Sequence, residues 1–453
     1  MKTKFIITLA IFTSFASFSQ KKWTLKECVD QALERNITIQ QNKLNLQIAE
    51  KDVAIAKGNF LPGLNSNVGN SGSFGLTTGG DNTRSSADRY NLSLGLNGSG
   101  TIFNGFRNTN TYKQAQLGVE TSKYDLQKIE NDISLLVVNG YLNVLFAKEN
   151  LNVAQVQYEI SKKQIEAIKS RFEAGVVAKG EVLNTQSTAA SNLQSVIAQE
   201  NVLNLALLNL AQTIQAPITN FDVAPIELGQ PLVNLLYNDS DIVFEKSLIN
   251  RPENERARLA IENANLSIKI AKGSFLPTLT YSFGANTFYN TTLGLPEVTR
   301  GVDQNNNPFV MDNRLYNQLG NNLSYSLGLS LNIPIFNRFQ TKNNVAKSKI
   351  SKEIFITRLE SEKIQLKQTI EQAFLDAKSA LKSYQAAKIS LAAQEEAFKN
   401  SQQRYNFGDM TLFDFDQVRT RLVNAQGIMI RSKYDYVFKT KILQFYSGEL
   451  VLE

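Results

Sequence analysis

Short stretches of the chain alternate apolar residues with small polar ones. In the clearest, 325–333, apolar side chains at odd positions are separated by Ser, Gly or Asn. Residues 278–285 alternate in the same way, with Leu279, Tyr281 and Phe283 among the apolar positions. A period of two with one apolar and one small polar face predicts β-strands. We expect four strands, near 64–74, 90–103, 278–288 and 322–335.

A long helical stretch follows each pair of strands. No Pro occurs between Pro62 and Pro217 or after Pro334, so nothing there breaks a helix. We expect long helices at about 105–173 and 338–406, and returning helices at about 179–215 and 412–447. In the second long helix, apolar residues recur at spacings of four and three, the period of a coiled coil: Leu366, Ile370, Ala373, Ala377, Ala380, Tyr384, Ala387 and Leu391.

The two halves of the chain repeat each other. The sequence Ala-Lys-Gly-x-Phe-Leu-Pro occurs at 56–62 and again at 271–277, an offset of 215 residues. Ser-Leu-Gly-Leu at 93–96 and Ile-Phe-Asn at 102–104 both recur 233 residues later. A duplication of this size makes each half one supersecondary unit. We assign 20–216 to the first repeat, 252–453 to the second, and 217–251, with its three prolines, to an irregular connector.

The first residues have the pattern of an export signal. Lys2 and Lys4 precede a short apolar stretch that ends in small residues, which predicts a cleaved signal peptide at 1–19. No later stretch has 18 consecutive apolar residues, so we expect no membrane-spanning helix.

The composition argues against an enzymatic function. The chain has no His and only one Cys, which removes the commonest general base and the commonest zinc ligand. The net charge of +7 is scattered rather than gathered in a patch, so we expect no nucleic-acid partner. We predict no catalytic residue, no cofactor and no metal site.

The strands could form a half-buried soluble sheet or part of a membrane barrel. Their polar face is small and uncharged, as a water-filled lumen tolerates, and aromatic residues bracket them, including Phe60, Phe103, Phe275 and Phe336. Both features favour the barrel. A closed barrel needs about eight or more strands, and open edges do not survive in lipid. Two chains would supply eight strands, which side chains nearly fill, whereas three would supply twelve and leave a channel.

The ordered, duplicated set of motifs resembles the TolC-like outer-membrane efflux family, the outer membrane factors. The motifs on which the resemblance rests are Trp-Thr-Leu at 23–25, both Phe-Leu-Pro and both Ile-Phe-Asn elements, and the paired aromatic-x-x-Gly turns at 172–175 and 405–408. The resemblance implies an α+β membrane protein: a homotrimer whose twelve-stranded transmembrane β-barrel continues into a periplasmic α-barrel of coiled-coil helices. It implies a passive exit duct in the outer-membrane lipid, part of a tripartite efflux pump or a type I secretion system. The partners would be a periplasmic adaptor protein and, indirectly, an inner-membrane transporter.

The resemblance also implies roles for single residues. The helix turns that meet the adaptor correspond to 172–177 and 405–410, which include Phe172, Gly175, Val176, Tyr405, Gly408 and Asp409. The residues that match the entrance gate are Glu181, Tyr405 and Asp414. Two positions depart from the family pattern: Met410 replaces a basic residue and Gln417 replaces a second acid.

Two alternatives stay open on the sequence alone. Asp414 lies near the start of a helix, where a carboxylate also favours the helix dipole. The whole chain could instead be a structural or adhesive coiled-coil protein of the envelope, which would need neither strands nor a channel. The sequence does not identify the cargo.

Overall fold

The computed structural model describes residues 22–78, 84–86, 88–226, 235–302, 304–305 and 307–449. The expected signal peptide at 1–19 lies outside them. The chain divides into two compact units. The first unit contains residues up to 46, 122–258 and from 358 onward, and the second contains 47–121 and 259–357.

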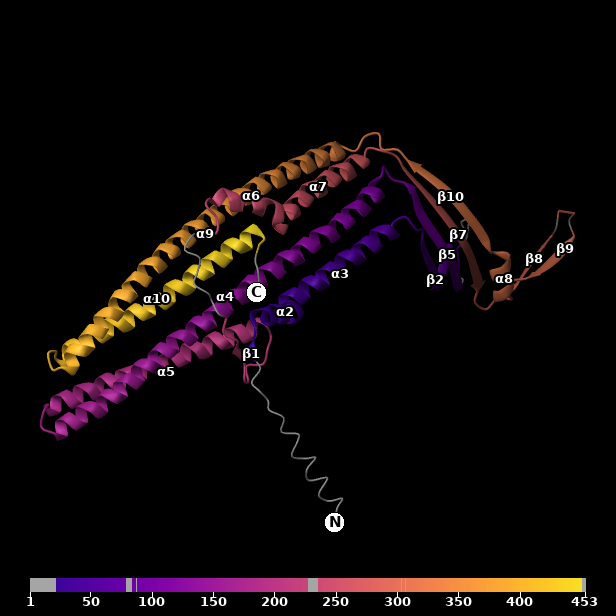
Figure 1. Cartoon of the computed structure of the whole chain (residues 1–453). Helices are drawn as coiled ribbons and strands as arrows, with labels where there is room; N and C mark the ends of the chain where they lie inside the picture. Colours follow the sequence, from indigo (N-terminus) through magenta and orange to yellow (C-terminus); the bar gives the residue numbers. More distant parts are fainter. Residues whose placement is uncertain are drawn as a thin grey trace, which may run out of the picture. The chain divides into compact units, whose positions relative to one another are not determined.

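The described part of the first half has this order of elements (Figure 1): β1 (Lys22–Trp23), α2 (Leu25–Arg35), α3 (Ile37–Gly58), β2 (Gly63–Ser73), β3 (Leu76–Thr78), β4 (Arg84–Ser86), β5 (Arg89–Phe103), α4 (Arg107–Glu173) and α5 (Lys179–Thr213). The rest of the described chain contains β6 (Asp222–Val223), α6 (Ser240–Asn250), α7 (Pro252–Gly273), β7 (Thr278–Thr292), β8 (Val298–Val302), β9 (Pro308–Asp312), α8 (Leu315–Asn321), β10 (Ser324–Asn332), α9 (Gln340–Asn406) and α10 (Leu412–Ser447). None of these helices combines the length and the hydrophobicity that a membrane crossing requires.

The duplication begins earlier in each half of the chain than the sequence motifs indicate. Helices α2 and α6 have 11 residues each, α3 and α7 have 22, and α4 and α9 have 67. The expectation of an irregular connector at 217–251 is wrong, because this segment contains β6 and all of α6. Helix α6 is the second copy of α2, and its N-cap Asp239 replaces the N-cap Thr24.

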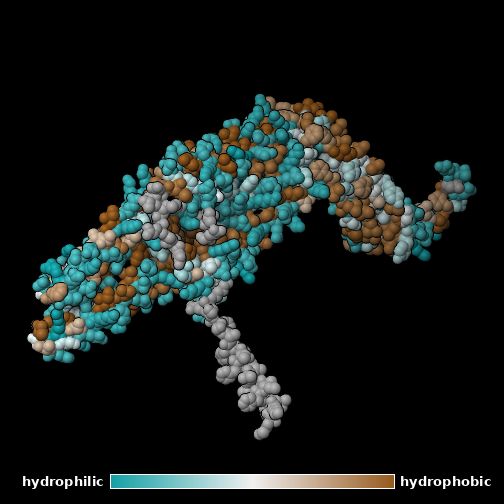
Figure 2. Space-filling view, in the orientation of Figure 1, coloured by the Kyte–Doolittle hydropathy of each residue, from teal (hydrophilic) through white to brown (hydrophobic). Residues whose placement is uncertain are grey.

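The second unit contains a four-stranded antiparallel sheet in the order β10-β7-β5-β2. On one face, Leu94 of β5 lies opposite Val68 of β2, and Phe283 of β7 lies opposite Gly98. Apolar side chains gather over these strands on the face seen in Figure 2. The outer strands β2 and β10 each pair on one side only within the described chain.

The other face of the sheet is polar and carries a chain of amides. Asn97 of β5 donates from Nδ2 to Oδ1 of Asn67 on β2 at 3.1 Å and to Oδ1 of Asn286 on β7 at 3.3 Å. Gly95 lies opposite both Asn67 and Asn286. A Cβ at residue 95 would contact both amide oxygens. Glycine therefore makes room for the amides on this face.

The first unit has its main core around Tyr141 of α4. The side chain is fully buried, and its hydroxyl donates to the carbonyl oxygens of Trp23 at 3.1 Å and Ala224 at 2.7 Å. Lys148 forms an ion pair of 2.5 Å with Asp222 in the same region. Burial raises the pKa of Tyr141 far above its ordinary value. These contacts hold the paired strands β1 and β6 against α4.

Tyr141→Phe should lower the free energy of unfolding of the first unit by about 1–3 kcal/mol, because the Ala224 carbonyl loses the Tyr141 hydroxyl as its donor, whereas the Trp23 carbonyl keeps the Ala224 N–H at 2.8 Å. Thermal unfolding of the purified protein followed by circular dichroism would measure the change. Tyr384→Phe is the matched control, because the described residues offer the Tyr384 hydroxyl no hydrogen bond and its ring stacks on Tyr436 at 6.2 Å. Equal effects of the two substitutions would contradict the assignment.

Candidate functional site

The two helix turns of the first unit end the long helices in the same way. Gly175 has φ 73° and Gly408 has φ 81°, the left-handed conformation that glycine adopts without strain. At the first turn, the Gly175 N–H donates to the Phe172 carbonyl and the Val176 N–H to the Arg171 carbonyl, both at 2.9 Å. This paired arrangement closes a helix C-terminus and sends the chain back. A Cβ at either glycine would meet no atom within 4 Å, so the backbone conformation alone calls for glycine.

Large apolar side chains are exposed at both turns. Phe172 is 42% exposed and Val176 is 69% exposed, as a surface that binds a partner requires. At the other turn Phe407, which lies inside the predicted turn at 405–410, is 83% exposed, and Phe413, which lies outside it, is 77% exposed. The sequence indicates both as residues at or beside this turn, since each lies within six residues of Gly408.

Tyr405 connects the two helix hairpins within one chain. Arg171 of α4 donates from Nη1 to the Tyr405 hydroxyl at 3.2 Å, and its guanidinium lies 5.4 Å from the centre of the Tyr405 ring. The same ring stacks on Phe415 of α10 with a centroid distance of 4.9 Å. Burial raises the pKa of Tyr405, so its hydroxyl stays protonated at neutral pH.

Asp414 caps helix α10. Its backbone N–H donates to Oγ1 of the N-cap Thr411 at 3.1 Å, and the Thr411 hydroxyl donates to Asp414 Oδ2 at 2.7 Å. The carboxylate also lies in the first turn, where the helix dipole favours negative charge. Within one chain the geometry therefore accounts for Asp414 as a capping residue. Glu181 has the equivalent place in the first turn of α5, and Asp409 is exposed at its turn.

A buried polar cluster joins the hairpins beyond Tyr405, and the sequence reasoning missed it. The Arg419 side chain is only 4% exposed, and its Nη2 lies 3.2 Å from Asp416 Oδ1. Gln164 of α4 donates to the same Asp416 oxygen at 3.5 Å and accepts a hydrogen bond from Arg419. Burial raises the pKa of Asp416 and lowers that of Arg419, and in each case the opposite charge of the partner offsets part of the effect.

A hollow of about 860 Å³ opens beside this cluster, between α5 and α10. Glu181, Asp416, Arg419 and Arg421 line it together with hydroxyl and amide side chains. No group of three or more residues suited to hold a metal ion occurs in the described parts of the chain. The arrangement offers hydrogen bonds and charges to a partner or to a passing solute, and it presents no assembled nucleophile and base.

Comparisons with known proteins match nearly the whole chain. A model of the family described as outer membrane efflux protein matches residues 28–214 and 243–449. The outer membrane efflux protein BepC of Brucella suis is 19% identical, with an alignment covering 99% of this chain and 90% of BepC. The outer membrane protein TolC of Escherichia coli is 24% identical over 76% of this chain and 72% of TolC.

Solved channels have the same fold. The Campylobacter jejuni CmeC outer membrane channel has a TM-score of 0.74 at 19% identity, covering 95% of this chain and 86% of CmeC. The open state of the Neisseria gonorrhoeae MtrE outer membrane channel has a TM-score of 0.71 at 20% identity, covering 95% of this chain and 90% of MtrE. The expected α+β fold class with internal duplication is therefore confirmed.

Arg419→Met should destabilise the first unit by roughly 2–3 kcal/mol at pH 8, somewhat less than for a fully buried pair, because Asp416 loses its counter-charge. Removing Arg419 should raise the pKa of Asp416 further above its unfolded value. An acid with a raised pKa contributes stability below its unfolded pKa and loses it as the pH rises through the folded pKa. The penalty should therefore shrink from pH 8 to pH 5.

Urea unfolding at both pH values would measure this dependence. Arg421→Met is the control, because Arg421 lies on the same helix and, among the described residues, its side chain donates a hydrogen bond of 3.2 Å to the exposed Gln417. Adding Asp416→Asn to Arg419→Met should abolish the pH dependence. A penalty of Arg419→Met that is equal at pH 5 and pH 8 would refute the coupling.

Proposed function

The chain belongs to the outer membrane efflux protein family, and from this premise we propose that it is the outer-membrane exit duct of a tripartite efflux pump or a type I secretion system. Three copies form one duct, which conducts substrate passively from a periplasmic adaptor and an inner-membrane transporter to the exterior. The mature protein reaches the outer membrane after cleavage of a signal peptide at 1–19.

The two-faced sheet with unpaired edges carries the proposal. Each backbone N–H and C=O left unpaired in hydrocarbon costs several kcal/mol, so a sheet in a membrane must close on itself. Four strands cannot close, whereas three copies of the sheet supply about twelve and enclose a channel. The polar face with Asn67, Asn97 and Asn286 then lines the water-filled lumen, and the apolar face contacts lipid.

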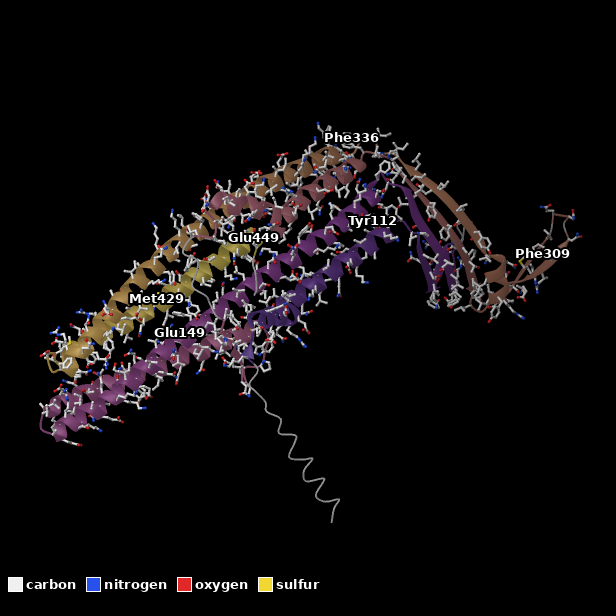
Figure 3. The ribbon with its side chains drawn as sticks, viewed as in Figure 1. Tyr112, Glu149, Phe309, Phe336, Met429 and Glu449 are labelled. Atoms are coloured by element: carbon white, nitrogen blue, oxygen red, sulfur yellow. The ribbon has the colours of Figure 1, made fainter. Side chains whose placement is uncertain are left out.

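Aromatic pairs mark the ends of the strands in both repeats. Phe103 and Phe106 meet edge to face with ring centroids 5.2 Å apart, and Phe336 and Phe339 do the same at 5.4 Å. Figure 3 labels Phe336 at the junction between β10 and α9. Aromatic rings at this position are typical of the boundary between membrane and water. The boundary then falls where the strands pass into helices.

The helix turns supply the adaptor contact. Gly175 and Gly408 set the shape of the turns, and the exposed Phe172, Val176 and Phe407 supply apolar surface for a partner. Asp409 adds a charge at the rim. In the trimer, three copies each of Glu181, Tyr405 and Asp414 surround the entrance, where repeated carboxylates attract cations.

The duct performs no reaction of its own. The absence of His from the sequence and the hydroxyl- and amide-rich lining of its hollows support a conducting wall rather than a catalyst. One relative is named for an exported molecule: the pyoverdine export outer membrane protein OpmQ of Pseudomonas aeruginosa. We assign the choice of cargo to the transporter and adaptor, because a neutral polar wall excludes solutes mainly by width.

The purified protein should be a trimer in detergent and should conduct ions poorly in planar bilayers until the entrance opens. Light scattering with detergent correction measures the mass, and single-channel recording measures conductance. A stable monomer without channel activity would refute the duct. It would favour the structural or adhesive coiled-coil protein, which explains the long helices but not the two-faced sheet.

Glu181→Ala combined with Tyr405→Phe should raise the resting conductance several-fold, because the loss of the three Arg171–Tyr405 hydrogen bonds that join the hairpins outweighs the lost attraction of three carboxylates for cations. Bilayer recording and entry of large antibiotics into cells would show the change. Glu200→Ala, an exposed carboxylate far along α5, is the control. Unchanged conductance in the double variant would remove both residues from gating.

A further inference from the structure

The two repeats have matching strand registers as well as matching helices. In the first repeat, Gly63 of β2 lies opposite Ser99 of β5. Their counterparts, offset by 215 and 233 residues, are Thr278 of β7 and Asn332 of β10, which also lie opposite each other. Each contact in one repeat can therefore be assigned a counterpart in the other, to the residue.

One contact surface joins the repeats inside the second unit. Gln114 of α4 donates from Nε2 to Asn263 Oδ1 at 2.6 Å and to Ser267 Oγ at 2.8 Å, both on α7. Where α4 begins and α7 ends, Gly105 and Gly273 approach so closely that a Cβ on either would overlap the backbone of the other. Strands β5 and β7 pair directly beside this contact.

The equivalent faces of α3 and α9 have no cover in the part of the chain that the structure describes. Ile55 of α3 is 67% exposed, whereas its counterpart Ile270 of α7 is half-buried. Ile350 of α9 is 63% exposed, whereas its counterpart Leu117 of α4 is half-buried. The same two helix faces are thus covered where the repeats meet and bare at the opposite sides of the unit.

Resting on the proposed trimer, we infer that a second copy of this chain covers these faces, repeating between subunits the contact that joins the repeats within one chain. The counterparts of Gln114 and Ser267 are Lys347 and Asp52. Both are exposed, and their charges are opposite. Lys347 of one copy therefore forms an ion pair with Asp52 of the partner subunit, where the chain itself has a neutral hydrogen bond.

Gly58 supports the same arrangement. It is the counterpart of Gly273, yet a Cβ at Gly58 would meet nothing within 4 Å in the chain, and its φ is not in the left-handed region. No contact with the described residues explains a glycine there. The counterpart of Gly105 is Arg338, whose φ of 55° keeps the same left-handed backbone. The main chain at Arg338 therefore lies against Gly58 of the partner subunit.

The arrangement also fixes how the edge strands pair. Ser99 of β5 lies opposite Ser282 of β7. The counterparts are Asn332 of β10 and Asn67 of β2. Asn332 of one copy thus lies opposite Asn67 of the partner subunit, both on the polar face. A slip of one residue would turn apolar side chains into the lumen, so the register is strongly specified.

Charge reversal tests the ion pair. Asp52→Lys or Lys347→Asp alone places like charges together and should lower the temperature at which the trimer dissociates in detergent by several degrees. The double variant should restore most of this loss. Glu50→Lys and Lys349→Asp, exposed neighbours with the same charge changes, are the matched controls and should leave the temperature unchanged. Additive losses in the double variant would overturn the ion pair.

Cysteine cross-linking tests the register. In a Cys28→Ala background, Asn332→Cys with Asn67→Cys should give covalently linked subunits on oxidation. Asn332→Cys with Asn65→Cys places the second thiol two residues away on the same face, beyond the reach of a disulfide, and should not link.

The outcomes separate the two proposals. Linking through position 65 in a conducting trimer would overturn the register and leave the duct intact. A trimer in which neither pair links would also overturn the register. Failure of the unmodified protein to form a trimer would overturn the duct itself, and the register with it.

Discussion

The structure depends on one constraint: backbone N–H and C=O groups that leave water need hydrogen-bond partners. Within the described chain, the four-stranded sheet of the second unit pairs its inner strands β5 and β7 on both sides and leaves β2 and β10 each with one unpaired edge. In water the free N–H and C=O groups of such an edge bind solvent, but in lipid they have no alternative partner. A sheet with one apolar face and one face of small polar residues, with Arg89 at the start of β5 as a charge on the polar side, suits a boundary between lipid and water. In the proposed trimer, closure with further copies meets both demands.

Because of the internal duplication, this closure requires no second kind of contact surface. In the proposed trimer the same kind of contact serves inside the chain and between copies, with α4 against α7 as the pattern for α9 against α3. The copies diverged where their neighbours differ: Gln114 forms a neutral hydrogen bond within the chain, whereas its counterpart Lys347 carries a charge. Helix lengths diverged very little: α2 and α6, α3 and α7, and α4 and α9 have equal lengths, and α5 and α10 differ by one residue.

Long periodic segments were predictable from the sequence, and tertiary contacts were not. The period of two and the absence of Pro located the strands and long helices, with α4 and α9 beginning two residues later than expected. Helix α6 was missed because it matches α2 in position and burial but shares only one residue, Leu33 with Leu248, and prolines flank it. The Asp416–Arg419–Gln164 cluster was missed because Gln164 lies about 250 positions away. Asp414 was selected by resemblance, and its local geometry shows a helix cap.

Hydrogen–deuterium exchange of the protein in lipid nanodiscs tests the pairing of the strand edges most directly. If neighbouring copies complete the sheet, amides in β2 and β10 exchange as slowly as those in β5 and β7, because every strand has a partner on both sides. Rapid exchange of the outward-facing amides of β2 and β10, with β5 and β7 protected, would show that the edges stay open and would contradict the account.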